Sequence, residues 1–154
     1  MAWERTFAML KPDTVQRALI GPVLARLEAK GFRIAAMKLI QVSPDQAARH
    51  YAVHQGKPFY DRLVRYIRSS PVVVLVLEAP DAVAQLRRFV GATKPNEADP
   101  GTIRGDFGLD ISNNLIHASD SPANAALETA VYFGPEEILD YRRSADGWLV
   151  EEQA

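Results

Sequence analysis

Residues 72–77 have the sequence VVVLVL, which is the longest apolar run in the chain. Valine and leucine without a polar interruption over this length are typical of a buried strand. Pro71 marks its start. Asp81 follows it and opens a helix whose apolar residues repeat at helical spacing as far as Gly91. We therefore expect a buried strand that is followed closely by a helix.

Outward from this run, three more strands are predicted, at residues 5–10, 32–42 and 114–118. Proline, glycine and capping residues separate four further helical segments. These helices are expected between Gly21-Pro22 and Gly31, from the capping box at residues 43–46 toward Tyr51, from Phe59 to Ile67, and from Ser121-Pro122 through Glu128 to the stop at Gly134-Pro135.

The order of these elements is β-α-β-α-α-β-α-loop-β-α. It predicts an α+β fold with a ferredoxin-like βαββαβ arrangement, in which a four-stranded antiparallel sheet carries its helices on one face. The chain has 154 residues, an ordinary size for one domain. We expect one domain over residues 1–154, in which residues 140–154 form a polar surface tail.

Composition excludes several classes of protein. The net charge of −1 argues against a general binder of nucleic acid or anionic membranes. The absence of cysteine excludes disulfides and thiolate metal sites and fits a cytoplasmic protein. We expect no signal peptide, because the amino terminus lacks an apolar segment. No stretch reaches the ~20 apolar residues of a membrane span.

The segment from residue 91 to residue 112 has no periodic pattern. It contains four of the nine glycines and two of the ten prolines. A structureless loop of about 22 residues in a compact domain is usually functional. Its run PGTIRGDFG, at residues 100–108, places Arg104 among glycines.

His117 lies at the end of the fourth predicted strand, within NNLIHASDS at residues 113–121. A cationic, glycine-rich loop upstream of a histidine suits phosphoryl transfer, because it supplies charge for the phosphate and a nitrogen to receive it. Glu128 could hold one ring nitrogen and leave the other free to attack. The alternatives are a structural histidine and an exposed helix carboxylate.

Three cations would converge if the predicted topology holds. Lys11 ends the first strand, Arg87 lies near the end of a helix, and Arg104 lies in the long loop with Thr93. A cation about 4 Å from a phosphate attracts it by about 4 kcal/mol at an effective dielectric of 20. The three would therefore fix a triphosphate, whereas a solvated surface charge is the alternative for each.

Other candidate residues are less specific. His50 and His54 have metal-ligand spacing, but no HExxH pattern or third ligand accompanies them, so we expect no metal there. Phe59 is expected either to pack in the core or to stack on a nucleobase. The sequence has no P-loop, GxGxxG or kinase HRD/DFG motif, so any nucleotide would bind without a glycine-rich phosphate cradle of those kinds.

Five stretches together carry a resemblance to a known family. They are ERTFAMLKPD at residues 4–13, HQGKPF at 54–59, GAT at 91–93, PGTIRGDFG at 100–108 and NLIHASDS at 114–121. In this order, and with little or no insertion over about residues 4–138, the chain resembles the nucleoside diphosphate kinases. The last two runs are highly specific.

The resemblance implies a ping-pong transfer of the γ-phosphate from a nucleoside triphosphate, typically ATP, to nucleoside diphosphates, which balances nucleotide pools. It makes His117 the phosphohistidine nucleophile and Glu128 its orienting partner, with Ser119 and Lys11 as further catalytic residues. Phe59 would stack on the base, with Ile111 on its other side, whereas the remaining contacts reach phosphate or ribose. The implied nucleotide-binding residues are Lys11, Tyr51, Phe59, Arg87, Thr93, Arg104, Ile111 and Asn114.

The resemblance also implies a cofactor and partners. Mg²⁺ would bridge the nucleotide phosphates without direct protein ligands, and nucleotides would be the substrates. A homo-oligomer built from dimers, as a tetramer or hexamer, is expected, without membrane or nucleic-acid partners. Two residues depart from the family pattern, which usually has glycine at both positions. Ala118 could crowd the nucleophile, and Thr14 is expected to be peripheral.

Two alternatives to an enzyme remain open from the sequence. A phosphohistidine signalling or interaction module could keep His117 and act mainly on protein partners. An RNA-binding ferredoxin-like domain is the second alternative, but the chain lacks the aromatic RNP1 motif of such domains. The intact set of Lys11, Arg87, Arg104 and Asn114 favours nucleotide turnover.

Overall fold

Four strands form one antiparallel sheet in the computed structural model, in which residues 2–151 are described. The order across the sheet is β2-β3-β1-β4, which confirms the predicted ferredoxin-like α+β fold. The strands are β1 (Trp3–Leu10), β2 (Arg33–Ile40), β3 (Val72–Pro80) and β4 (Ile116–Ala118).

The apolar run of β3 occupies the interior of this sheet. Every residue of the strand is buried, because β3 lies between β1 and β2 and is covered on both faces. β1 pairs with it over its whole length, from Trp3 opposite Pro80 to Leu10 opposite Val73. On its other side β1 pairs with the short β4, where Met9 lies opposite His117. β4 is therefore an edge strand that begins beside the carboxyl end of β1.

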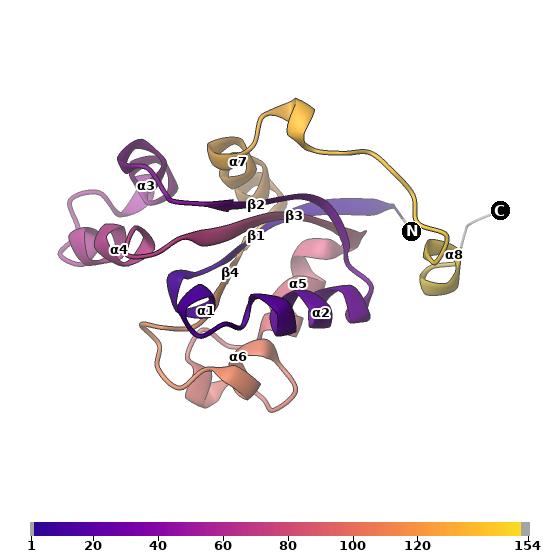
Figure 1. The fold of residues 1–154 in the computed structure, drawn as a ribbon, viewed down its shortest axis with the longest axis horizontal. Coiled ribbons are helices and arrows are strands. Elements are labelled where there is room, and N and C mark those ends of the chain that lie inside the picture. The colour runs from indigo at the N-terminus through magenta and orange to yellow at the C-terminus, as the bar shows by residue number, and fades with distance from the viewer. Residues whose placement is uncertain (1, 152–154) are drawn as a thin grey trace.

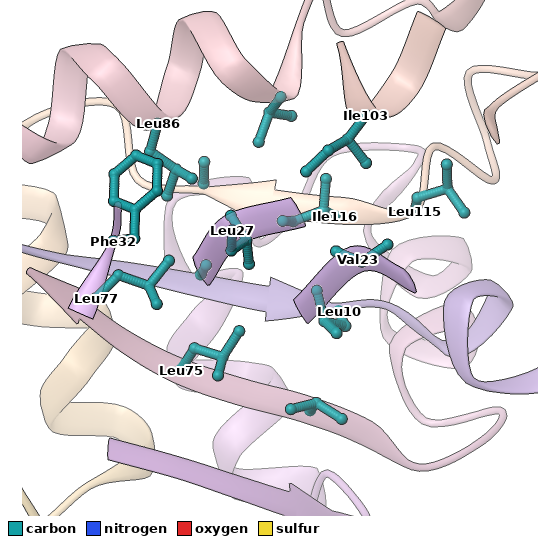
Figure 2. Packing of buried hydrophobic residues seen from close by; sticks show 14 of the residues in the cluster. Leu10, Val23, Leu27, Phe32, Leu75, Leu77, Leu86, Ile103, Leu115 and Ile116 are labelled. Atoms are coloured by element: carbon teal, nitrogen blue, oxygen red, sulfur yellow. The ribbon is translucent and has the colours of Figure 1, made fainter. Parts of the chain in front are cut away.

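Helices cover both faces of the sheet, as Figure 1 shows, so the expected single covered face is corrected. One face packs against α2 (Ile20–Lys30) and α5 (Ala82–Val90), whose side chains lie over those of β1 and β3 in Figure 2. The other face is covered by α3 (Pro44–His50), α4 (Tyr60–Ile67) and α7 (Pro122–Tyr132).

Strand alternation explains the second layer. Ala8 and Leu10 point to the face covered by α2 and α5. Phe7 and Met9 point to the opposite face and pack with Tyr132. Burial of each large apolar side chain contributes about 1.5–3 kcal/mol, so both faces need a cover. The helices α3, α4 and α7 cover the second face with their apolar residues.

The helix ends follow the predicted signals. The Ser43 hydroxyl accepts from the Gln46 N–H at 3.1 Å, and the Gln46 side chain accepts from the Ser43 N–H at 3.0 Å, which completes the capping box. Gly31 ends α2 with a φ of +118°, a conformation that favours glycine.

The long loop contains more structure than its sequence predicts. It holds the 3-10 turn Pro95–Glu97 and the short helix α6 (Ile103–Phe107). The Thr102 hydroxyl caps α6 by accepting from the Gly105 N–H at 3.0 Å. Local side-chain bonds, rather than apolar periodicity, form these short elements. Four other short elements are α1 (Pro12–Gln16), the 3-10 turns Ala52–His54 and Pro135–Glu137, and α8 (Asp146–Leu149).

The carboxyl-terminal segment lies on the surface and is hydrogen-bonded to β2; residues 152–154 lie outside the described range. The Leu139 N–H donates to the Ala35 carbonyl at 2.9 Å. Further along, the buried carboxylate of Asp146 accepts from Arg33 at 2.8 Å and from Arg143. The segment therefore runs along the sheet to α8, beside the start of β1 (Figure 1).

None of the helices in the described part of the chain combines the length and the apolar character of a membrane span.

Candidate active site

A cleft opens beside the carboxyl end of β1 and consists of two adjoining cavities of about 670 and 470 Å³. Both cavities are lined by Lys11, Tyr51 and Leu63. The first cavity continues to β4 and α7, and the second to the segment that precedes β4. Seven of the residues predicted for the site line the cleft: Lys11, Tyr51, Arg87, Ile111, Asn114, His117 and Glu128.

His117 extends into the first cavity from β4, and its ring is tied to α7. The Glu128 carboxylate holds Nε2 with both oxygens, at 2.8 and 2.9 Å. The ring is therefore oriented through Nε2, which leaves Nδ1 as the nitrogen for another contact. About a quarter of the His117 side chain, 27%, is exposed, so the ring is reachable from the cleft.

Glu128 is itself fixed from a second side. The Ser119 hydroxyl donates to Glu128 Oε2 at 2.5 Å, and Ser119 is fully buried behind the cleft. Burial acts to raise the pKa of Glu128, but the bonds from His117 and Ser119 outweigh it and hold the pKa below its usual range. The carboxylate is therefore ionised at neutral pH and stabilises a proton on Nε2.

His50 lies next to the nucleophile candidate, although no sequence pattern predicted a catalytic position for it. Its ring centroid is 5.1 Å from that of His117, and the Tyr132 hydroxyl lies 3.0 Å from its Nδ1. Burial, followed by the charge of His117, lowers the pKa of His50 to about 3. A neutral imidazole here adds no like charge beside His117.

Lys11 and Asn114 join β1 to the segment before β4. Lys11 Nζ donates to Asn114 Oδ1 at 2.8 Å, and Asn114 Nδ2 donates to the Thr93 carbonyl at 3.1 Å. Burial, together with the nearby charge of Arg104, lowers the pKa of Lys11 to about 8. Thr93 therefore contributes through its backbone carbonyl. This carbonyl orients the Asn114 side-chain amide, which in turn accepts from the Lys11 ammonium.

Arg104 is buried just behind the cleft wall. Its guanidinium donates to the carbonyls of Asn114 at 3.1 Å, Gly91 at 3.1 Å and Ile116 at 2.5 Å. Burial and the charge of Arg87 lower its pKa to about 10. Arg104 thus fixes the backbone on both sides of Leu115 while it places a positive charge under the site.

Arg87 completes the group of three cations that the sequence predicted. It lies near the end of α5, lines the first cavity, and donates to the Ala118 carbonyl at 3.1 Å. The structure therefore brings Lys11, Arg87 and Arg104 together around His117. This cationic surface suits an anionic ligand, because each positive charge lowers the energy of a nearby phosphate.

Phe59 lies beside the cleft rather than on its described lining. Its ring packs against His54 with centroids 5.3 Å apart, and 38% of the residue is exposed. Ile111 lines the second cavity and is 47% exposed. The core-packing alternative for Phe59 is thus disfavoured, since a core side chain is buried.

The sequence missed several residues of the site. Arg62 lines the second cavity together with Tyr66 and Asn113. Asp13 bonds with Tyr66 below the cleft. Asp13 could have been found from the sequence, because it directly follows Lys11-Pro12. Arg62 and Tyr66 could not, because the pattern of α4 indicates only an amphipathic helix.

The two departures from the family pattern have different environments. Ala118 belongs to the buried cluster with Ala8 and Ile116, on the face opposite His117, so its methyl group does not crowd the ring. Thr14 is fully buried, and its hydroxyl donates to the Leu115 carbonyl at 2.6 Å. Thr14 is therefore not peripheral, which corrects that expectation.

Comparison with known proteins gives a single answer. The family model for nucleoside diphosphate kinase matches residues 4–138. A nucleoside diphosphate kinase of Roseiflexus castenholzii is 55% identical over 148 residues, which cover 96% of this chain and 99% of that protein. One of Moorella thermoacetica is 57% identical over 138 residues, covering 90% and 99%.

Solved structures agree with the sequence relatives. A halophilic nucleoside diphosphate kinase from Halobacterium salinarum, solved in complex with CDP, superposes with a TM-score of 0.94 at 45% identity. The match covers 97% of this chain and all of that one. A family protein from Babesia bovis gives a TM-score of 0.92 at 44% identity and covers 96% and 99%.

Proposed function

This chain belongs to the nucleoside diphosphate kinase family, and we propose that His117 is the residue that carries the phosphoryl group between nucleotides. The protein is a phosphotransferase with nucleotide substrates, which favours the enzyme over the scaffold and RNA-binding alternatives. The observation that carries the proposal is the Glu128 carboxylate on His117 Nε2, which leaves Nδ1 for the reaction.

The proposed reaction has two displacements at one site. In the first, the Nδ1 lone pair attacks the γ-phosphorus, an N–P bond forms, and the bond to the bridging oxygen breaks, so that the nucleoside diphosphate leaves. In the second, the terminal phosphate oxygen of another diphosphate attacks and the N–P bond breaks. The Nε2 proton stays hydrogen-bonded to Glu128 throughout, and the ionised carboxylate stabilises the positive ring.

The cations are proposed to hold the polyphosphate. Lys11 and Arg87 would contact phosphate directly from the cavity lining, and Arg104 would add its charge from behind. Tyr51 would add a neutral hydroxyl, since burial raises its pKa to about 12. Asn114 would reach the ribose. The CDP complex of the Halobacterium relative supports a diphosphate in this kind of cleft.

Mg²⁺ is proposed to arrive with the nucleotide. The donor set around the cleft is dominated by Lys11, Arg87 and Arg104, which repel a bare cation, and residues 2–151 contain no cluster of three His, Cys, Asp or Glu side chains suited to a metal. These residues fit a magnesium–nucleotide complex, in which the ion would supply charge neutralisation to the phosphates. The protein side chains would bind the remaining phosphate oxygens.

We propose that the enzyme forms a homo-oligomer built from dimers and works in the cytoplasm as one domain over residues 1–154. Exposed apolar side chains on the edge strand β2, Met37 at 51% and Leu39 at 64%, support an oligomer. The cysteine-free sequence supports a reducing compartment.

Phe59→Ala is expected to raise KM for all nucleoside diphosphates by similar factors, about tenfold, because aromatic stacking contributes about 1–3 kcal/mol per base and does not depend on its identity. KM for ADP, GDP, CDP and UDP would be measured side by side. A loss confined to one base would contradict generic stacking. Phe59→Tyr keeps the ring and should stay near the parent value.

The binding of nucleotides is expected to weaken as pH rises through about 8, the pKa to which burial and Arg104 lower Lys11. Lys11 is charged below this pH and loses its attraction for phosphate above it. KM for GDP should rise about tenfold between pH 7.5 and 9.5. Lys11→Arg keeps its charge and should remove most of the rise. An equal rise in both proteins would assign it to another group.

The test of the proposed function is a labelling experiment. The protein is mixed with γ-labelled ATP and Mg²⁺ without acceptor, and GDP is added afterwards. We expect acid-labile, alkali-stable label on the parent protein, transferred into GTP on addition of GDP, and no label on His117→Asn. Label on the variant, or none on a folded parent protein, would reject His117 as the carrier.

A further inference from the structure

The backbone just before the nucleophile is strained. Leu115 has a φ of +74°, although it carries a branched side chain. The Ile116 N–H donates to the Asn114 carbonyl at 2.9 Å, which closes a γ-turn with Leu115 at its centre. A conformation of this kind costs on the order of 1–3 kcal/mol and persists only where its surroundings enforce it.

This turn connects two parts of the site. Asn114, on one side, holds the Lys11 ammonium, and His117 follows two residues after Leu115. The Leu115 side chain is fully buried in the cluster drawn in Figure 2, beside Ile103 and Ile116. The turn therefore sets where the amide and the imidazole lie relative to each other.

Residues of α1 and the position before it bond both polar groups of Leu115. Asp13 Oδ2 accepts from the Leu115 N–H at 3.0 Å. The Leu115 carbonyl accepts from the Thr14 hydroxyl at 2.6 Å and from the Lys11 N–H at 2.8 Å. The Tyr66 hydroxyl donates to the other Asp13 oxygen and orients that carboxylate from α4.

We propose that Thr14, acting with Asp13, is a positioning residue for phosphotransfer. The Thr14 hydroxyl and the Asp13 carboxylate grip the Leu115 peptide groups from one side and hold the strained turn. Asn114 then stays on Lys11, and His117 stays aligned with Glu128. This inference rests on the proposed role of His117.

The hydroxyl of Thr14, rather than its bulk, is the group that acts. A fully buried threonine can act through packing alone. The Thr14 hydroxyl, however, donates to the carbonyl of Leu115, the residue of the site with a strained backbone. Removal of that bond leaves the Leu115 carbonyl with the Lys11 N–H as its remaining donor and so loosens the turn. A displacement near 1 Å at a reacting group can reduce the rate by about 10²-fold, so even a partial relaxation is measurable.

The test compares Thr14→Val, which keeps shape and loses the hydroxyl, with Thr14→Ser, which keeps the hydroxyl and loses a methyl group. The rate of His117 labelling by γ-labelled ATP is measured in a single turnover, well below the melting temperature of each variant. We expect Thr14→Val to be about tenfold slower and Thr14→Ser to be within twofold of the parent protein.

Tyr66→Phe is the second variant, in case Thr14→Val does not fold. It removes one bond to Asp13 and should slow labelling about threefold, whereas the matched control Tyr60→Phe on the same helix should not. The positioning role would be overturned if Thr14→Val were labelled as fast as the parent protein, or if Thr14→Ser were slowed as much as Thr14→Val. If Thr14→Val does not fold, an unchanged labelling rate in Tyr66→Phe would overturn the role. If the folded parent protein takes no label, the proposed function fails instead.

Discussion

His117→Asn is expected to lower kcat/KM for phosphate transfer by about 10⁴-fold or more, which corresponds to about 5.5 kcal/mol of transition-state stabilisation. Asparagine places a planar amide near the position of Nδ1 without added bulk, so we expect the cleft to retain its shape, but the nucleophilic nitrogen is gone. Steady-state transfer from ATP to GDP would be measured under coupled-assay conditions with substrate near KM.

Two measurements make this result interpretable. Titration with ADP should give a dissociation constant within threefold of the parent protein, because the cations and Phe59 are intact, and the thermal unfolding transition should be preserved. Turnover above about 1% of the parent rate in a folded, nucleotide-binding variant would show that another group accepts the phosphate.

Arg104→Ala is expected to have the second-largest effect and to act on both stability and rate. Three backbone carbonyls lose the guanidinium as a donor, although the Asn114 carbonyl keeps the Ile116 N–H. A buried carbonyl left unpaired costs about 1–3 kcal/mol. We expect the free energy of unfolding to fall by about 3 kcal/mol and kcat/KM by about 10³-fold, with the larger part in kcat, since the charge under the site is also lost.

Two further variants separate these contributions. Arg104→Lys keeps the charge but has one nitrogen donor in place of the three guanidinium nitrogens. It should therefore recover part of kcat and little of the free energy of unfolding. Arg88→Ala removes an exposed arginine from the same helix as Arg87 and should change the free energy of unfolding by less than about 0.5 kcal/mol. A loss confined to KM in Arg104→Ala would argue against a role in the transition state.

The features that could be predicted from the sequence are those with strong local signals. The apolar run of residues 72–77, the capping box at Ser43 and the glycine after α2 each depend on neighbours in the chain, and all three have the expected structure. The His117–Glu128 pair also falls in this group, because a strand and the helix after it bring the two side chains together.

The features that escaped prediction depend on partners far away in the sequence. α6 forms around the Thr102 cap in a segment without apolar periodicity, and Asp146 is anchored by Arg33, 113 residues earlier. The positive φ of Leu115 has no signal in its residue type, since glycine or asparagine would be expected there. Thr14 gives no sequence signal that its hydroxyl bonds Leu115.

Under the proposed role of His117, the contact of both Glu128 oxygens with one ring nitrogen also decides which isomer of phosphohistidine the enzyme would form. With Nε2 occupied by the carboxylate, the phosphorus can add only at Nδ1, which gives 1-phosphohistidine and not the 3-phospho isomer. A modified ring of this kind carries its phosphate on the nitrogen nearer the backbone. The position of the phosphate on the ring is thus set by Glu128, through its contact with Nε2, rather than by the incoming nucleotide.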